Sequence, residues 1–125
     1  MEPTTVTPLR LLIADKSKVY MSALESLLKL NQNITIIEFC DSSFSLMNIL
    51  KKSEVDILIF DPIIFNENST SEIQNIKNQF PHLKIIALSI QESSNMRADM
   101  LKAGVFEHLS KWDDAKKIIS LINYN

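Results

Sequence analysis

The 125-residue chain contains one glycine, one cysteine and one tryptophan. The lone cysteine, Cys40, excludes an internal disulfide and favours a reducing compartment. No apolar run approaches the roughly 18 residues of a membrane-spanning helix, and the N-terminal MEPTTVTPLR lacks the basic and apolar segments of a secretion signal. The formal net charge of −2 gives no global attraction to nucleic acid or an anionic membrane. These absences favour a cytoplasmic domain that binds neither nucleic acid nor a membrane directly.

The composition is that of an ordinary globular protein, with 46% hydrophobic and 22% charged residues. A chain of this length can bury one core without a disulfide or a structural metal. Pro3 and Pro8, set among threonines, disfavour an ordered element at the N-terminus. We therefore expect a flexible lead-in over residues 1–8 and one domain over residues 9–125.

Five short apolar runs alternate with five segments of helical periodicity. The runs are rich in isoleucine, leucine and valine, as in strands that are buried on both faces of a parallel sheet. Alternation of strand and helix predicts an α/β fold with helices on both faces, and the common order for five strands is the flavodoxin-like 2-1-3-4-5. We therefore predict a single (βα)5 doubly wound domain with strands at 9–14, 34–39, 55–60, 84–88 and 105–109.

The helical segments carry start and stop signals. Ser17, and either Ser42 or Ser43, are candidate N-caps of the first two helices. Ser69 and Glu72 form a candidate capping box for the third helix, and Gly104 is expected at a left-handed position that ends the fourth. Apolar stripes predict the faces that pack on the sheet: Tyr20, Leu24, Leu27 and Leu28; Phe44, Met47 and Leu50; Ile73, Ile76 and Phe80; Met96, Met100 and Ala103; Ala115, Ile118, Ile119 and Ile122.

Polar residues follow four of the five predicted strands. Asp15 comes after the first strand, Asp61 after the third and Ser89 after the fourth. Lys111 lies shortly beyond the fifth strand. Because a doubly wound sheet brings these strand ends together, the sequence predicts a cleft with two carboxylates, a hydroxyl and an ammonium. Such a cleft could stabilise a carboxylate to which further negative charge is added.

At these strand ends the sequence resembles a known family. The segments LLIAD, DILIFDP, KIIALS and AGVFEHLSK resemble the receiver domain of two-component response regulators, the CheY-like fold, and the RLLIAD opening is most similar to NarL/LuxR-type receivers. The resemblance covers about residues 9 to 123. The intervals from Lys16 through Asp61 and Ser89 to Lys111 are typical of that subgroup. Each motif is weak alone, but four in order at strand ends are a strong signal for the fold.

The resemblance implies a role for each residue in the cleft. Asp61 would accept a phosphoryl group from a histidine kinase, Ser89 would hydrogen-bond the phosphate, and Lys111 would pair with it electrostatically. An acidic pair after the first strand would hold a Mg²⁺ ion jointly with Asp61. The metal lets a dianionic phosphoryl group approach an anionic carboxylate. In this chain the metal site implied by the resemblance would be left with Asp15 and Asp61.

The chain departs from the family pattern at that acidic pair. Lys16 stands where the second acid belongs, and a charged lysine has no lone pair to give and repels a dication, so Mg²⁺ affinity should be badly reduced. Two placements of its ammonium stay open: in solvent, or in the cleft against Asp61 or Asp15 as a substitute for the cation. The loop PIIFNENST after Asp61 also lacks the glycines of the family's loop, which puts the usual turn in doubt.

Two aromatic positions also differ from the pattern. His108 occupies the position at which receivers often carry a switch tyrosine or phenylalanine, and the simpler interpretation is a surface or interface histidine. Trp112 is expected to cover the end of the core, with an anchor for a partner as the alternative.

Three functions are compatible with the sequence. The favoured one is an atypical receiver that acts through protein–protein contacts without phosphotransfer. The second is a conventional receiver that is phosphorylated on Asp61 with Mg²⁺. The third, a flavodoxin-like small-ligand binder, lacks a glycine-rich phosphate loop after the first strand. None of the three is an enzyme in the usual sense.

The resemblance also implies partners. A histidine kinase or another signalling protein would bind the domain. The implied output surface is helix four, strand five and helix five, or helices one and five as in NarL-type homodimers. A transcription regulator of this kind would continue beyond the final SLINYN into a C-terminal DNA-binding effector domain. The chain is therefore expected to be either a stand-alone domain or a piece of a longer regulator.

Overall fold

The computed structural model describes residues 7–90 and 93–124, and in it a parallel five-stranded sheet forms the centre of the molecule. The strand order is β2-β1-β3-β4-β5, as predicted. The winding direction switches between β1 and β3, so a crevice is expected beyond the carboxyl ends of these two strands. The strands are β1 Leu9–Ala14, β2 Ile34–Cys40, β3 Ile57–Phe60, β4 Lys84–Ser89 and β5 Glu107–Ser110.

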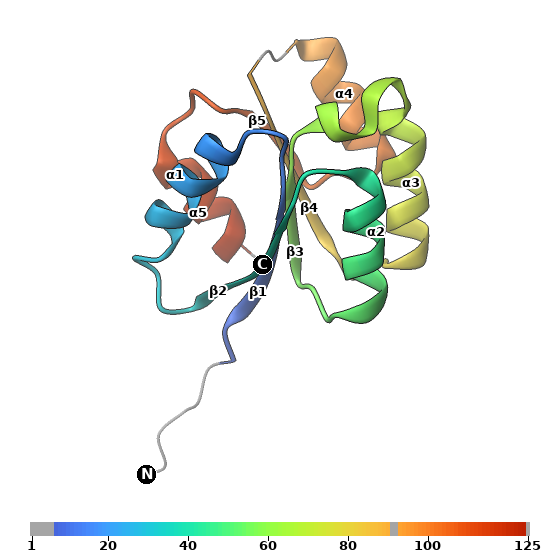
Figure 1. The fold of residues 1–125 in the computed structure, drawn as a ribbon. Coiled ribbons are helices and arrows are strands. Elements are labelled where there is room, and N and C mark those ends of the chain that lie inside the picture. The colour runs from blue at the N-terminus through green and yellow to red at the C-terminus, as the bar shows by residue number, and fades with distance from the viewer. Residues whose placement is uncertain (1–6, 91–92, 125) are drawn as a thin grey trace.

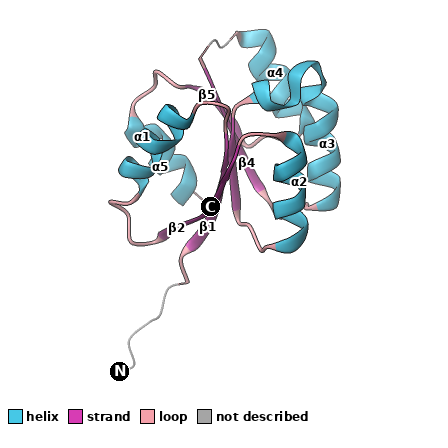
Figure 2. Cartoon of the chain, in the orientation of Figure 1, coloured by secondary structure: helices cyan, strands magenta, loops and turns pink. Residues whose placement is uncertain are grey.

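Helices cover both faces of this sheet (Figure 1). Helices α1 and α5 lie on one face, and α2, α3 and α4 lie on the other (Figure 2). A short 3-10 helix, η1, joins β3 to α3. The bounds are α1 Lys18–Leu28, α2 Ser43–Lys52, η1 Pro62–Asn68, α3 Ser69–Gln79, α4 Ser94–Ala103 and α5 Ala115–Asn123.

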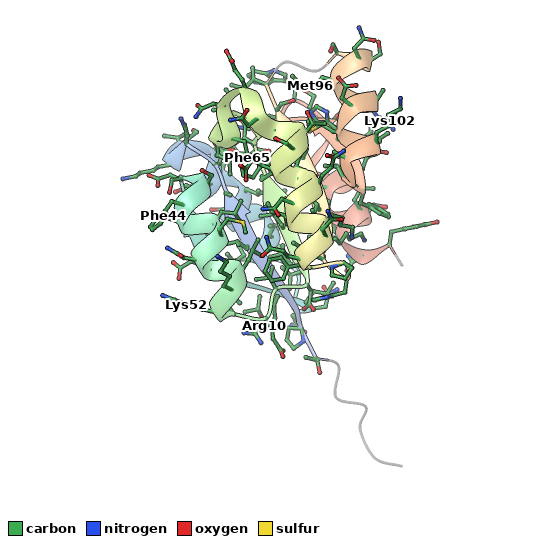
Figure 3. All side chains as sticks on the ribbon, turned by 90° about the vertical axis from the view of Figure 1, so that its right-hand side faces the viewer. Arg10, Phe44, Lys52, Phe65, Met96 and Lys102 are labelled. Atoms are coloured by element: carbon green, nitrogen blue, oxygen red, sulfur yellow. The ribbon has the colours of Figure 1, made fainter. Side chains whose placement is uncertain are left out.

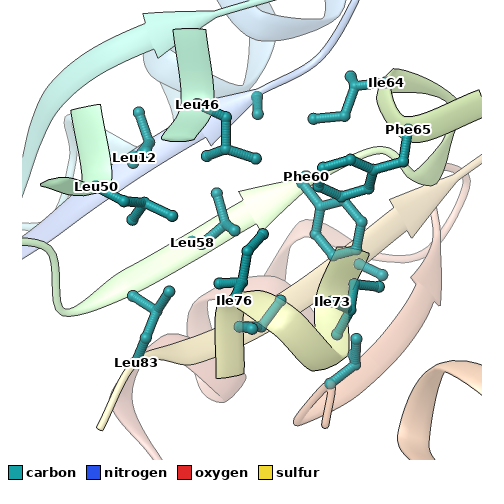
Figure 4. Packing of buried hydrophobic residues seen from close by; sticks show 14 of the residues in the cluster. Leu12, Leu46, Leu50, Leu58, Phe60, Ile64, Phe65, Ile73, Ile76 and Leu83 are labelled. Atoms are coloured by element: carbon teal, nitrogen blue, oxygen red, sulfur yellow. The ribbon is translucent and has the colours of Figure 1, made fainter. Parts of the chain in front are cut away.

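The sheet separates two hydrophobic clusters. Successive residues of β1 point to opposite faces, so Leu11 and Ile13 pack toward α1 and α5, whereas Leu12 and Ala14 pack in the other cluster. Figure 4 shows this second cluster, which lies between the sheet and helices α2 and α3. All four residues of β3 are buried. A strand covered on both faces therefore explains the continuous apolar run in the sequence.

Several helix ends follow the predicted signals. Ser17 caps α1 by accepting a hydrogen bond from the Tyr20 amide, and Ser42 caps α2 in the same way. Gly104 follows α4 with a φ of 123°, which an L residue rarely adopts. The bounds of β3 and β5 differ by about two residues from the predicted runs, because the pairing of each strand starts after the apolar stretch has begun.

Three local predictions about helices were wrong. Met96 was expected on the face of α4 that packs on the sheet, but it is 37% exposed. Phe44 is 76% exposed and lies on the outer side of α2 (Figure 3), and Leu46 fills the core instead. The Ser69 hydroxyl donates to the Pro62 carbonyl, and the N-terminus of α3 has no side-chain cap. The reason is η1, which runs directly into α3 and supplies the preceding turn, so no capping box is needed there.

Within residues 7–90 and 93–124, none of the helices combines the length and the apolar character that crossing a membrane requires. Of the lead-in expected over residues 1–8, residues 1–6 lie outside the described residues.

Candidate functional site

The carboxyl ends of β1, β3, β4 and β5 bring the four predicted cleft residues to one edge of the sheet. Asp15, Asp61 and Ser89 are 4%, 4% and 6% exposed. Lys111 follows β5, and its amide donates to the Ser89 carbonyl at 2.8 Å, which continues the strand pairing into the site. The parallel register thus places the side chains together even though they are far apart in the sequence.

The Lys111 ammonium bridges the two aspartates. Its Nζ lies 2.7 Å from Oδ2 of Asp15 and 2.8 Å from Oδ2 of Asp61, and all three side chains are only 5 to 6% exposed. Burial alone would lower the pKa of Lys111, but the hydrogen bonds and charges of the two carboxylates raise it above its ordinary value. The ammonium therefore stays charged, and the pocket contains one cation between two acids.

The outer carboxylate oxygens are also engaged. Oδ1 of Asp15 accepts a hydrogen bond from the Ser17 amide at 2.8 Å, and Oδ1 of Asp61 accepts one from the Ile63 amide at 3.0 Å. Each carboxylate is thus held by a backbone N–H just after its strand and by the lysine. This arrangement satisfies buried charges that would otherwise be costly.

Tyr20 completes the surroundings of the ammonium. Lys111 Nζ lies 4.4 Å from the centroid of the Tyr20 ring, within the range of a cation–π contact. Burial, followed by the charges of Asp15 and Asp61, raises the pKa of the Tyr20 phenol to about 12. The phenol therefore stays neutral near pH 7. The sequence placed Tyr20 only in the apolar stripe of the first helix; its position in the first turn after Asp15 was the available signal for a role at the site.

Lys16 does not enter the cleft. Its side chain is exposed, and it forms no ion pair with any residue in the described part of the chain, so of the two placements left open the one in solvent is observed and the contact with Asp15 or Asp61 is not. The turn explains this, because the Ser17 amide folds back onto Asp15 and turns Lys16 outward. A second ammonium beside Lys111 would also be repelled.

His108 is fully buried, so the interpretation as a surface histidine is wrong. It lies in β5 and faces the same side of the sheet as its neighbour Ala87 and as Ser89. Its Nε2 lies 2.7 Å from the Ser89 hydroxyl. The serine assigned to phosphate by resemblance therefore already contacts a side chain of the next strand.

The rim of the site is apolar and exposed. Trp112 is 80% exposed, so it does not cover the end of the core as expected, because the turn after Lys111 directs it outward. Ile63 and Ile90 are 57% and 56% exposed. In the glycine-free loop after Asp61, Asn66 adopts a φ of 54° and a ψ of −126°, which a glycine would adopt without strain.

The donor set for a divalent cation lacks one acid of the family pattern. Among the described residues, no group of three histidine, cysteine, aspartate or glutamate side chains could hold a metal ion. Asp15 and Asp61 are two carboxylates that already share Lys111, and the third acidic position is occupied by Lys16. Mg²⁺ needs a near-octahedral set of oxygen ligands. We therefore assign no step at this site to a metal.

Comparisons with known sequences agree with this architecture. The family model described as the response regulator receiver domain matches residues 11–123. The DNA-binding transcriptional regulator NtrC of Azospirillum brasilense is 33% identical over 67 residues, which cover 54% of this chain and 14% of the relative. The transcriptional regulatory protein DegU of Brevibacillus brevis is 17% identical over 121 residues, which cover 97% of this chain and 51% of the relative. The chain thus spans at most about half the length of these curated relatives.

Solved structures share the fold. The isolated receiver domain of RcsB from Salmonella enterica serovar Typhimurium, in the presence of phosphomimetic BeF3−, superposes with a TM-score of 0.83 at 20% identity, covering 91% of this chain and 85% of that one. The signal receiver domain of the NarL regulator from Mycobacterium tuberculosis gives a TM-score of 0.83 at 11% identity, covering 95% and 99%. At these identities the likeness concerns the fold alone.

Proposed function

Because this chain belongs to the response regulator receiver domains of two-component signalling, we propose that it is an atypical receiver that acts through protein–protein contacts. In this proposal the site works without phosphotransfer and without a metal. The observation that carries it is the Lys111 ammonium, which bridges Asp15 and Asp61 while a lysine occupies the position of the second acid. The internal cation then performs the charge neutralisation that a bound metal performs in a conventional receiver.

The chemistry of phosphotransfer explains why this arrangement opposes it. A carboxylate oxygen of Asp61 would have to attack the phosphorus of a donor, while the bond from phosphorus to the donor atom, a nitrogen in phosphohistidine or an oxygen in acetyl phosphate, breaks and its electron pair leaves with the donor. The incoming group is anionic, and the only buried cation that the described site residues offer is already shared by two carboxylates. With the charge of a metal missing, the approach is repelled.

The competing hypothesis is a conventional receiver that is phosphorylated on Asp61 with Mg²⁺. It is supported by the assembly of Asp61, Ser89 and Lys111 at one edge of the sheet. We place it second because of Lys16. The small-ligand binder is no longer needed as an explanation, since the family accounts for the cleft residues.

Incubation with acetyl phosphate, with and without Mg²⁺, tests the proposal by intact mass. We expect no added phosphoryl group on the natural protein and a labile gain of one group on Lys16→Asp with Mg²⁺. Asp61→Asn, alone and combined with Lys16→Asp, is the matched control for the modified residue. A gain on the natural protein that disappears in Asp61→Asn would refute the proposal and establish the conventional reading.

Failure of both proteins to react would have a different meaning. It would point to the glycine-free loop Pro62–Asn68, in which Asn66 has a positive φ, or to a complete loss of the receiver chemistry. Asn66→Gly combined with Lys16→Asp would separate the two causes.

The partners are part of the same proposal. We propose a histidine kinase or another signalling protein as the contact, at a cytoplasmic location, and a homodimer through α1 and α5 as the mode of self-association. NtrC and DegU are described as transcription regulators and are much longer than this chain. A DNA-binding effector domain in a longer protein is therefore the output that we propose.

A further inference from the structure

The Lys111 ammonium lies against an aromatic ring. Asp15, Asp61 and Lys111 are only 5 to 6% exposed, although they lie at the open edge of the sheet. Tyr20, in the first turn of α1, is half-buried and places its ring centroid 4.4 Å from Lys111 Nζ. An ammonium at this distance from a ring face is attracted to the ring.

A closed circuit of contacts holds this ring in place. The Ser17 amide donates to Oδ1 of Asp15 at 2.8 Å, and the Ser17 hydroxyl accepts from the Tyr20 amide at 3.1 Å. The Tyr20 ring faces Lys111, and Lys111 returns to Oδ2 of Asp15 at 2.7 Å. The first turn of α1 is therefore linked to the ion pairs in two ways, through the hydrogen bonds of Ser17 and through the Tyr20 ring.

We propose that Tyr20 covers this site: its ring packs over the Lys111 ammonium, keeps it between Asp15 and Asp61, and thereby slows the access of phosphodonors and divalent cations. This inference rests on the proposed function, because it adds a second barrier to phosphodonors beside the one set by Lys16. Tyr20 is a specificity-determining residue in this sense, and it performs no chemistry itself.

Neighbouring apolar side chains do not offer the same cover. Val19, the preceding residue of α1, is 83% exposed, and Ile63 beside Asp61 is 57% exposed. The raised pKa of the Tyr20 phenol keeps the ring neutral, so it adds no further negative charge to a pocket with two acids. A neutral ring is attracted to the lysine ammonium and is not repelled by charge from the two carboxylates.

Chemical acetylation of lysines measures the cover directly. The full chain is treated briefly with an N-hydroxysuccinimide ester of acetate, and the labelling rate of each lysine is read by peptide mass spectrometry. Lys84, a partly buried lysine at the opposite edge of the sheet, is the internal reference. The compared proteins are the natural chain, Tyr20→Ala and Tyr20→Phe, and Tyr20→Leu repeats the test with less packing lost.

We expect the Lys111-to-Lys84 rate ratio to rise about tenfold in Tyr20→Ala, the size expected when a desolvated cation–ring contact is lost. Tyr20→Phe keeps the ring and should keep the ratio, and Tyr20→Leu should lie between. A general loosening of the fold raises both rates and leaves the ratio unchanged. An unchanged ratio in Tyr20→Ala and Tyr20→Leu, or a ratio in Tyr20→Phe as high as in Tyr20→Ala, overturns the inference.

A second readout links the cover to the site's selectivity. In the Lys16→Asp background with Mg²⁺, labelling of Asp61 by acetyl phosphate should be faster with Tyr20→Ala than with Tyr20. The acetylation ratio does not depend on phosphotransfer. Labelling of the natural chain would therefore refute the proposed function, whereas a normal acetylation ratio in Tyr20→Ala would refute only the role of Tyr20.

Discussion

Two lysines at opposite edges of the sheet each place an ammonium 4.4 Å from the centroid of an aromatic ring. At the carboxyl edge, Lys111 lies over Tyr20 and bonds two carboxylates. At the amino edge, the side of the sheet at which the parallel strands begin, Lys84 lies over Phe106. Its ammonium donates to the carbonyls of Leu121 and Tyr124 at the end of α5. The two sites therefore differ mainly in the charge of the oxygens that receive the ammonium.

That difference decides the sign of the pKa shift. Burial lowers the pKa of Lys84 below its ordinary value of 10.5, because neither carbonyls nor a ring fully replace the lost hydration. Burial acts in the same direction on Lys111, but the two carboxylates outweigh it and raise the pKa. An aromatic ring thus accompanies the ammonium in both places, and only the two carboxylates beside Lys111 reverse the direction of the pKa shift.

The largest effect is expected from Lys111→Met. Removing the cation leaves Asp15 and Asp61 buried and facing each other, so we expect a loss of about 3 to 5 kcal/mol in the free energy of unfolding near pH 7, as for other broken buried pairs. Urea unfolding measures it. Adding Asp15→Asn and Asp61→Asn to the variant should restore part of the loss. A loss well below that of Lys84→Met would contradict the view that charge pairing dominates at the carboxyl edge.

Gly104→Ala probes the amino edge through the backbone. Gly104 has a φ of 123°, and an added Cβ would lie 2.8 Å from Cγ of Lys77. Lys77 cannot easily withdraw, because its ammonium donates to the carbonyls of Pro81 and Leu83 at 2.9 and 2.6 Å. We expect a loss of about 2 to 3 kcal/mol in the free energy of unfolding from strain and overlap together.

Ala98→Gly, on the exposed side of the same helix, calibrates that result, since it changes helix propensity by about 1 kcal/mol without a clash. Combining Gly104→Ala with Lys77→Ala should recover the part of the loss that is due to overlap. Full additivity of the two substitutions would mean that the positive φ alone is responsible.

Lys84→Met is expected to cost less, about 1 to 2 kcal/mol near pH 7, because the lost hydrogen bonds are offset by the released burial penalty. Its pH dependence is the sharper test of the comparison. Because the pKa of Lys84 is lowered in the folded state, the unfolded chain binds more protons between that lowered pKa and 10.5, and this lysine makes stability rise with pH in that window.

Lys111 should act in the opposite direction. Its pKa is raised in the folded state, so its stabilisation is complete below pH 10.5 and is lost as the pH rises beyond that value. Urea unfolding at several alkaline pH values, with Lys84→Met and Lys111→Met beside the natural chain, separates the two slopes. Equal slopes for both lysines would show that the carboxylates do not govern the carboxyl edge.

The sequence was most informative where chemistry and strand pattern coincide. Asp15, Asp61 and Ser89 each end a continuous apolar run, so a parallel sheet had to bring them to one edge, and the predicted strand order is confirmed. Ser17, Ser42 and Gly104 were predictable because capping depends on residues close in the sequence.

Side-chain direction was much harder to predict. Lys16 and His108 were placed by analogy with a position in a pattern, but a turn hydrogen bond directs Lys16 outward and the alternation of a short strand buries His108. Tyr20 was missed as a site residue because helical periodicity says that it faces the sheet, not which end of the sheet it reaches. Such facts depend on three-dimensional contacts that sequence spacing does not encode.

The smallest effect on stability is expected from removing the Tyr20 phenol. Its pKa is raised from 10.0 to about 12 by burial and by the charges of Asp15 and Asp61. The folded state therefore holds this proton more tightly than the unfolded chain, so the associated stabilisation is complete below pH 10 and is lost as the pH rises through about 12. Near pH 7, Tyr20→Phe should leave the stability almost unchanged.

Absorbance of the phenolate at alkaline pH measures this proton, and the chain has only two tyrosines. Subtracting the titration of Tyr20→Phe from that of the natural chain isolates Tyr20, and we expect a midpoint near 12. In Asp15→Asn the midpoint should move down, because one of the two charges that oppose ionisation is gone. A midpoint at the ordinary value of 10.0 would mean that the Tyr20 ring is solvated. Lys111 would then lack the ring contact that Lys84 makes with Phe106, and the comparison of the two lysines would fail.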